Sequence, residues 1–360
     1  MEKKMMKKQL IIFTLVAFAV PYLLGIVMGI GYQKGIDLTV FPSAQMYYPA
    51  AGVMLAALLT RKNDDYIPRR FFIGYIINTL IMVIMAVVSV FIPAVSWLWP
   101  SQIVMMGGTI ILLILMLTEK KEKREAYGLK GKNWKGMVFV SVLFLVLYLV
   151  RAAVSYIISG QTDALLAVVS NSQTWILLLS VVVSYFLAFI PFFGEEYGWR
   201  YYLQPIMQKR FGAVKGVILL GVLWGIWHLP INFFYYASPA HGIMSVLAQI
   251  ITCITLGIFF AYGYMKTNNI WLPVILHYMN NNLVPVITGD VSADVLQNQQ
   301  VGWQDLLFLL VVNGILFLSF ALAGHFRKKE YQLPTMNERA DRICREASFR
   351  DGSLGASSES

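Results

Sequence analysis

The feature that most constrains this chain is a series of apolar runs, each about 20 residues long and almost free of charged side chains. As a helix, a run of that length crosses the hydrocarbon layer of a bilayer. Lipid also requires every backbone N–H and C=O to be hydrogen-bonded within the protein, which excludes an open sheet. Charged residues make up only 13% of the 360 positions, too few to cover a soluble protein of this size. We therefore expect an all-α, polytopic transmembrane bundle with the lipid bilayer as a partner.

Apolar periodicity and length predict about ten spans, at residues 9–31, 42–60, 71–95, 102–118, 137–159, 174–194, 214–235, 243–265, 270–288 and 303–324. Basic residues cluster in alternate connections: Lys3, Lys4, Lys7, Lys8, Arg61, Lys62, Arg69, Arg70, Lys120, Lys121, Lys123, Arg124, Lys130, Lys132, Lys135, Lys209, Arg210, Lys266, Arg327, Lys328 and Lys329. The other connections hold little that is basic beyond Lys34, and one carries Asp290 and Asp294. The positive-inside rule then predicts that both termini are cytoplasmic.

The N-terminus has the basic-then-apolar form of a signal peptide, but its apolar stretch is too long and no small-x-small cleavage site follows it. We expect it to remain attached as the first span. The short connections and the Lys-rich start favour a multi-pass protein of a bacterial plasma membrane.

Four regions are predicted along the chain. Residues 1–118 form an N-terminal four-helix membrane region, 119–135 a basic cytoplasmic loop, 136–326 a membrane core with the unusual chemistry, and 327–360 a disordered cytoplasmic tail with few apolar anchors.

The net charge of +10 does not predict a nucleic-acid partner. The basic residues lie between apolar runs rather than along one face with interleaved aromatics, as topology signals do. The two cysteines, Cys253 and Cys344, are far apart and indicate neither a disulfide framework nor a zinc knuckle.

Ionisable side chains inside membrane segments are costly and usually face a cavity or a partner. Glu195, Glu196 and Arg200 follow directly after a long apolar run. Glu196 and Arg200 are four residues apart, so on a helix they share a face and can pair. Glu195 is offset by about 100° and points elsewhere. The alternative is an interfacial cap with an aromatic belt at the headgroups.

Two of the four histidines, His228 and His277, lie deep in apolar runs. His277 and Asn281 are four residues apart, so a ring donor and an amide donor share a helix face, an arrangement suited to a developing oxyanion. The alternatives are a packing role for His228 and an interhelical hydrogen bond made by His277 and Asn281. Asn281 is chosen over its neighbours Asn280 and Asn282 by its spacing alone.

Three motifs in register resemble a known family. GEEYGWR fits EExxxR, WGIWH fits [FW]xxxH, and HYMNN fits HxxxN, in that order, within about residues 174–290. This region resembles the CPBP family of intramembrane proteases, also called the Abi or CAAX-protease-like family. The resemblance implies a catalytic set of Glu195, Glu196, Arg200, His228, His277 and Asn281.

The resemblance implies that Glu195 is the general base and polarises a water together with His228. His277 and Asn281 then donate to the oxyanion, and the second glutamate with Arg200 orients the first glutamate and the substrate. A His₂Glu zinc site is the alternative. There is no HExxH helix, and the spacing of His277 and Asn281 favours hydrogen bonding to substrate, so we expect neither metal nor cofactor.

The depth of these residues does not follow simply from the predicted spans. Glu195 falls at the cytoplasmic end of its run, whereas His228 lies 13 residues past Lys215, about 20 Å along a helix. Either the first turns of that helix lie outside the hydrocarbon layer, or the Glu195–Gln204 segment dips inward, or Lys215 snorkels. Each solution places the cavity in the cytoplasmic half. Arg151, in the middle of its span, is left without a role.

The expected function is hydrolysis of a membrane-associated or lipidated peptide. A non-hydrolytic bacteriocin-immunity or peptide-binding protein of the same fold is one alternative, and a proton-coupled carrier is another, although no duplicated halves or paired broken helices are evident. The sequence does not distinguish a prenylated C-terminus from a quorum-sensing pro-peptide, a bacteriocin leader or a lipoprotein fragment. It also gives no oligomeric state and no role for the first four helices.

Overall fold

The computed structural model describes residues 2–289 and 296–356, and within these ranges the chain is helical with no strand. The helices are α1 (Glu2–Thr14), α2 (Val20–Gln33), α3 (Val40–Gln45), α4 (Tyr48–Thr60), α5 (Arg69–Phe91), α6 (Leu98–Leu117), α7 (Lys121–Ala126), α8 (Trp134–Ile158), α9 (Thr162–Ser170), α10 (Ser172–Glu196), α11 (Gln204–Phe211), α12 (Ala213–Trp227), α13 (Leu229–Ile231), α14 (Gly242–Thr267), α15 (Trp271–Asn282), α16 (Val284–Thr288), α17 (Trp303–Phe308), α18 (Gly314–Leu316) and α19 (Met336–Ala356). Short π-helical segments join several of them: η1 (Leu15–Ala19), η2 (Tyr197–Leu203), η3 (Asn232–Tyr236) and η4 (Leu309–Asn313). Single 3₁₀ turns follow in η5 (Leu318–Leu322), η6 (Gly324–Phe326) and η7 (Lys329–Tyr331). The predicted all-α class is confirmed.

The protein is a multi-pass membrane protein with fewer full-length spans than expected. Six helices in the described residues are long and apolar enough to cross a membrane, and a seventh is added if the pair Ala213–Trp227 and Leu229–Tyr236, bent by 46°, counts as one span. Ten spans are therefore not confirmed. Residues 42–60, 270–288 and 303–324 form shorter or interrupted helices. Residues 42–60 and 270–288 are mostly buried or half-buried in the bundle, where the length that lipid requires is not needed. Residues 303–324 instead keep exposed apolar side chains, among them Trp303, Leu310 and Ile315.

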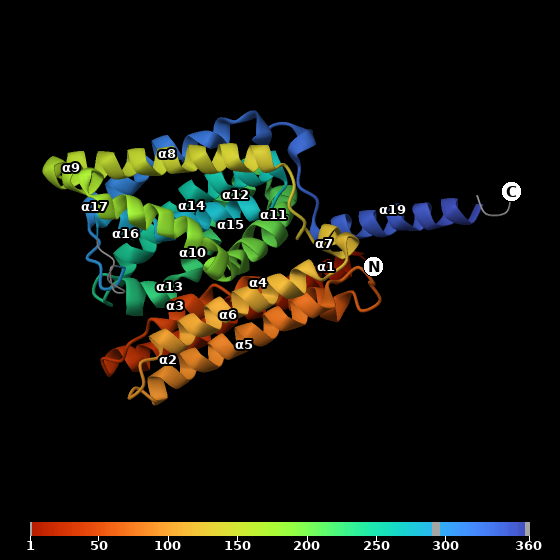
Figure 1. Ribbon diagram of the computed structural model, residues 1–360, viewed down its shortest axis with the longest axis horizontal. Helices are drawn as coiled ribbons and strands as arrows, with labels where there is room; N and C mark the ends of the chain where they lie inside the picture. The colour runs from red at the N-terminus through yellow and green to blue at the C-terminus, as the bar shows by residue number, and fades with distance from the viewer. Residues whose placement is uncertain (1, 290–295, 357–360) are drawn as a thin grey trace.

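Figure 1 shows the helices running roughly side by side, with α1 to α6 on one side of the molecule and α8 to α17 on the other. Helix α10 joins the two sides because it contacts α4 and α6 as well as α15. One end of the molecule holds α7, the start of α1 and α19, and the other holds α9, α13, α16 and α17 (Figure 1).

Three glycines, Gly221, Gly225 and Gly198, bring helices into close contact around the site described below. Gly221 and Gly225 of α12 face the backbone of α14, where a Cβ added at Gly225 would lie 2.6 Å from the Cα of Ile250. In the same way, a Cβ at Gly198 would lie 2.2 Å from the Cβ of Pro49, at the start of α4. Small residues four apart allow membrane helices to approach backbone to backbone.

The prediction of a span ending at residue 194 is wrong. The helical path continues from Ser172 to Phe211 over 40 residues. It bends where Ala188 leaves helical geometry, with φ −138° and ψ 17°, just before Pro191, because proline clashes with the carbonyl four residues earlier and cannot donate to it. Glu195 therefore lies 14 residues, about 21 Å, before the basic end at Lys209. His228 lies about as far beyond Lys215, so the two residues meet at one depth without a dipping loop.

The prediction of a disordered tail is wrong for much of that segment, because Met336–Ala356 forms α19. Met336, Ala340 and Ile343 are buried, and their spacing of four and three residues places them on one face of the helix. The count of apolar residues is low, but their periodicity is helical. The position of this end relative to the membrane stays a prediction.

Candidate active site

Glu195 is held inside the protein by a strong hydrogen bond from α12. Its side chain is 2% exposed, and its Oε2 accepts from the indole Nε1 of Trp224 at 2.7 Å. The preceding Gly194 lets α10 approach the chain at Met46, whose carbonyl oxygen would lie 2.3 Å from a Cβ there. The indole of Trp224 on α12 therefore sets the direction of the carboxylate, and the close packing of Gly194 on Met46 sets its depth in the bundle.

Glu196 points to a different neighbour, as its offset from Glu195 predicts. One oxygen accepts from Nε of Arg200 at 3.0 Å, which is the pair expected from their spacing. The other oxygen accepts from Nδ1 of His277 at 2.9 Å. Glu196 and Arg200 are both completely buried. This carboxylate therefore connects α10 to α15 and sets the orientation of the His277 ring.

Arg200 is enclosed by aromatic rings. Its guanidinium carbon lies 4.7 Å from the ring centroid of Trp224 and 5.6 Å from that of Phe260, distances typical of cation–π contacts. Among the described residues its Nη1 and Nη2 have no hydrogen-bond partner. Arg200 thus neutralises Glu196 and supports the face of the indole that binds Glu195.

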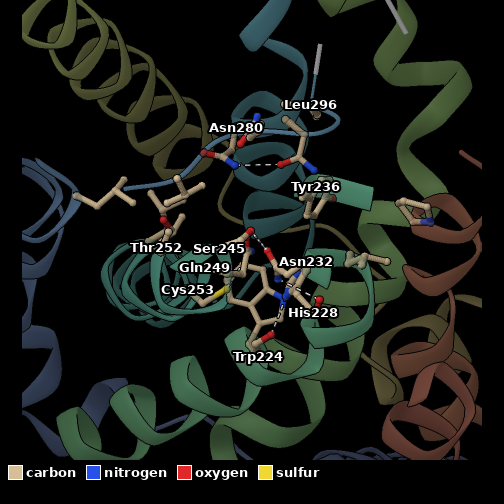
Figure 2. Close-up of a pocket in the computed structure, with 18 of the residues that line it drawn as sticks. Trp224, His228, Asn232, Tyr236, Ser245, Gln249, Thr252, Cys253, Asn280 and Leu296 are labelled. Atoms are coloured by element: carbon tan, nitrogen blue, oxygen red, sulfur yellow. Dashed lines mark hydrogen bonds between the residues drawn. The ribbon is translucent and has the colours of Figure 1, made fainter. Parts of the chain in front are cut away.

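His228 follows the last residue of α12, where the chain turns into α13. Its Nδ1 lies 2.7 Å from the carbonyl oxygen of Trp224. A carbonyl can only accept, so Nδ1 carries the hydrogen and Nε2 of the neutral ring is an acceptor. The backbone carbonyl of His228 accepts from Nδ2 of Asn232 at 3.0 Å, and Oδ1 of Asn232 accepts from the Ser245 hydroxyl at 2.6 Å. Figure 2 shows this chain of bonds.

Asn281 lies one turn after His277 on α15, as the HxxxN spacing predicts. Its Oδ1 accepts from Nδ2 of Asn280 at 2.9 Å. That bond fixes which edge of the Asn281 amide is the acceptor and directs its NH₂ group away from Asn280. Asn280 is therefore a support for Asn281.

A cavity of about 500 Å³ joins these side chains, a size typical of ligand-binding sites. Glu195, His228, His277 and Asn281 all line it, whereas Glu196 and Arg200 lie behind its wall. The other lining residues include Arg151, Asn232, Ser245, Gln249, Thr252, Cys253, Leu296, Gln299 and Asp305. Figure 2 shows the α14 side chains facing Trp224 and His228 across it. The six predicted residues thus form one cluster, with four at the cavity surface.

The rim of this cavity lies at the end of the molecule away from the basic connections. It includes Gln299, Gln300 and Val301, which follow α16, and Tyr236, which precedes α14, at the end opposite α7 and α19 (Figure 1). We expected the cavity in the half that carries the basic residues, and the structure differs. That expectation assumed a span ending at Glu195, whereas the helix runs on to Phe211.

Sequence reasoning missed three contributors to the site. Trp224 was identified only as an aromatic motif residue, but its N–H holds Glu195. Asn232 and Ser245 form the buried network next to His228. Asn232 is four residues after His228 on the same turn, a spacing that points to it, whereas the contact from Ser245 depends on how α14 packs.

No group of three or more His, Cys, Asp or Glu side chains in residues 2–289 and 296–356 is arranged to hold a metal ion. The Nδ1 of His277 faces Glu196, and the Nδ1 of His228 faces a backbone carbonyl. A reaction without metal or cofactor stays a prediction.

The model of the type II CAAX prenyl endopeptidase Rce1-like family matches residues 174–283, a stretch that contains all six predicted site residues. This region is similar to the CAAX-protease family. CAAX prenyl protease 2 of Methanococcus maripaludis is 30% identical over 101 residues, which are 27% of this chain and 37% of that relative. The resemblance stated from the three motifs is confirmed, and the CAAX-protease match begins on α10 and ends at the close of α15.

Proposed function

We propose that this protein is an intramembrane endopeptidase that hydrolyses a membrane-associated or lipidated peptide. The observation that carries the proposal is the convergence of Glu195, His228, His277 and Asn281, from three helices, on one cavity within the bundle. The family match over the same helices supports it. A carboxylate, two imidazoles and an amide in one cavity supply a base and oxyanion donors.

Water activation is assigned to Glu195 and His228. Oε2 of Glu195 is occupied by the Trp224 indole, so Oε1 is the oxygen that takes a proton from water. Nε2 of His228, an acceptor in the tautomer fixed by the Trp224 carbonyl, holds the second hydrogen of the same water. As the proton moves to Glu195, the water oxygen bonds to the scissile carbonyl carbon.

Stabilisation of the tetrahedral oxyanion is assigned to His277 and Asn281. Because Nδ1–H of His277 is donated to Glu196, its Nε2 donates to an oxyanion only when the ring is an imidazolium. Glu196 provides the negative partner for that cation. Loss of one oxyanion donor costs about 3 kcal/mol, or about 10²-fold in kcat.

In the last step the proton held by Glu195 passes to the leaving nitrogen, the C–N bond breaks, and the electron pair of that bond stays on nitrogen. The products are a new carboxylic acid, which then loses its proton to solvent or to the amine, and an amine, and the Glu195 carboxylate is restored. No step requires a metal or an oxidant.

The test uses purified protein in lipid nanodiscs and two quenched membrane-anchored peptides, one prenylated on cysteine and one not. Glu195→Gln and His228→Ala are expected to lower turnover by at least 10³-fold while thermal unfolding is unchanged, and a chelator is expected to have no effect. Lys215→Gln, at the far end of α12, is the control and should cleave as the unaltered protein does. Cleavage by Glu195→Gln at the unaltered rate would refute the proposal.

The site's location is part of the same proposal. The basic ends of α1, α4, α11 and α14 gather around α7 and α19, where Lys209 contacts Glu338 and Arg61 contacts Asp341. By the positive-inside rule that end is cytoplasmic, in a plasma membrane of bacterial type. The cavity rim then faces the opposite side, and substrate enters from there or laterally from lipid.

A further inference from the structure

Arg151 is a cation that the proposed hydrolysis leaves unused. It lies in α8, 17 residues after Trp134 and seven before Ile158, inside an apolar helix long enough to cross a membrane. Its neighbours Leu149 and Val150 are exposed on the outer surface, whereas Arg151 lines the cavity that contains Glu195. Its charge is thus directed into the site rather than into lipid.

Within the described residues Arg151 makes no ion pair and no hydrogen bond. Its guanidinium carbon lies 5.8 Å from the centroid of the Tyr148 ring. Tyr148 in turn donates to the backbone carbonyl of Asn280 at 3.2 Å, which holds this face of α8 against the end of α15. Arg151 is therefore positioned next to the helix that carries His277 and Asn281.

The acids that share the cavity are already engaged. Glu195 accepts from Trp224, and Asp305 accepts from the backbone N–H of Gly302 at 2.8 Å, capping α17. Neither forms an ion pair with Arg151. A lone cation in a membrane helix is costly and generally marks a pathway or a binding site. Among the described residues that line the cavity, no carboxylate pairs with Arg151.

We propose that Arg151 binds a carboxylate of the peptide substrate. The inference rests on the proposed function and specifies its substrate class, namely a peptide whose terminal or side-chain carboxylate lies a few residues from the scissile bond. Arginine suits this role because its planar fork pairs two N–H groups with two carboxylate oxygens. A lipid phosphate fits less well because Arg151 faces the internal cavity that holds the hydrolytic residues.

The experiment uses three quenched peptides of one sequence. The first ends in a free carboxylate, the second in an amide, and the third in an amide with an aspartate placed near the scissile bond. The unaltered protein is expected to show a kcat/KM about 10- to 100-fold higher for one carboxylate peptide than for the neutral one, mainly through KM. The first and third peptides distinguish the two sources of carboxylate.

Arg151→Gln is expected to remove that preference and cleave the three peptides equally, and Arg151→Lys to retain part of it. Lys135→Gln removes the same charge from an exposed position at the start of α8 and should keep the full preference. If Arg151→Gln does not fold, Arg151→Lys and the peptide comparison on unaltered protein decide the matter.

The inference is overturned if Arg151→Gln keeps the preference or if the unaltered protein shows none. Glu195→Gln separates this failure from failure of the proposed function. Where Glu195→Gln abolishes cleavage but the carboxylate preference survives in Arg151→Gln, only the inference fails. Binding of the uncleaved peptides to Glu195→Gln, with and without Arg151→Gln, tests the same preference without turnover.

Discussion

At the scale of residues, the two adjacent glutamates show how one helix serves two purposes. Glu195 and Glu196 differ by one position and therefore by about 100° around the helix. Glu195 lines the cavity, whereas Glu196 is enclosed between Arg200 and His277. The buried acid is neutralised and orients a ring, and the other stays available to a water.

Trp224 is the residue whose replacement most directly tests this arrangement. Trp224→Phe keeps an aromatic ring beside Arg200 but removes the N–H that holds Glu195 at 2.7 Å. A hydrogen bond to a charged group contributes about 2 kcal/mol, so kcat is expected to fall about 30-fold with little change in thermal stability. Steady-state cleavage of the quenched peptides measures this.

Trp175→Phe is the matched control, because Trp175 also donates its N–H, to the carbonyl of Val169 at 3.1 Å, but is exposed at the far end of α10. Its kcat should not change. A Trp224→Phe protein with unchanged kcat would show that the indole N–H does not position Glu195.

At the scale of elements, the site depends on where helices end and where they continue. Helix α12 ends at Trp227, which releases His228 from helical geometry at the cavity wall. Helix α10 continues through η2 into α11, which keeps Glu195 deep. Close packing of α12 on α14 brings the two sides of the cavity together, because Gly221 and Gly225 have no side chains to separate them.

Gly225→Ala tests that packing. The added Cβ would lie 2.6 Å from the Cα of Ile250, so α12 and α14 must move apart. Overpacking of this kind costs about 1–3 kcal/mol, and the shift also displaces Trp224 and His228. We expect a lower midpoint of thermal unfolding in detergent and a loss of cleavage. Gly107→Ala is the control, because a Cβ there meets nothing within 4 Å, and it should change neither the unfolding midpoint nor cleavage. An unaltered midpoint for Gly225→Ala would contradict the packing argument.

At the scale of the whole molecule, α19 joins helix ends that are far apart in the sequence. Asn337 exchanges hydrogen bonds with Gln9 of α1, at 3.2 and 2.9 Å. Arg339 donates to Asn268, which caps α14, at 2.7 Å. Arg61, after α4, pairs with both Asp64 and Asp341. Helix α19 thus connects the basic ends of α1 and α4, on one side of the molecule, to the basic end of α14 on the other.

Arg61→Gln is expected to weaken the contact between α19 and the end of α4, because it removes the ion pairs with Asp64 and Asp341. Asp64 is buried, and although Tyr127 still donates to it at 2.7 Å, it loses its cation. Removing one partner of a buried pair costs about 3 kcal/mol or more. The midpoint of thermal unfolding should fall, and protease should cleave near α19 sooner. Arg345→Ala, on the exposed side of α19, is the control and should keep the midpoint and the proteolysis rate of the unaltered protein. If Arg61→Gln also keeps both values, the proposed role of α19 is refuted.

The sequence alone determined the all-helical class and the basic connections, and it predicted six site residues that the structure brings into one cluster. These residues could be singled out because charge inside apolar runs is costly and usually faces a cavity or a partner. Spacing within a helix also determined which residues pair, as Glu196 with Arg200 shows. Only the tertiary structure decided what depends on neighbours from other helices. It showed that Trp224 holds Glu195, that residues 42–60 are mostly buried in protein, that the cavity opens away from the basic end, and that Arg151 shares it. Periodicity along one helix specifies a face, but the partner of that face is set by packing between helices.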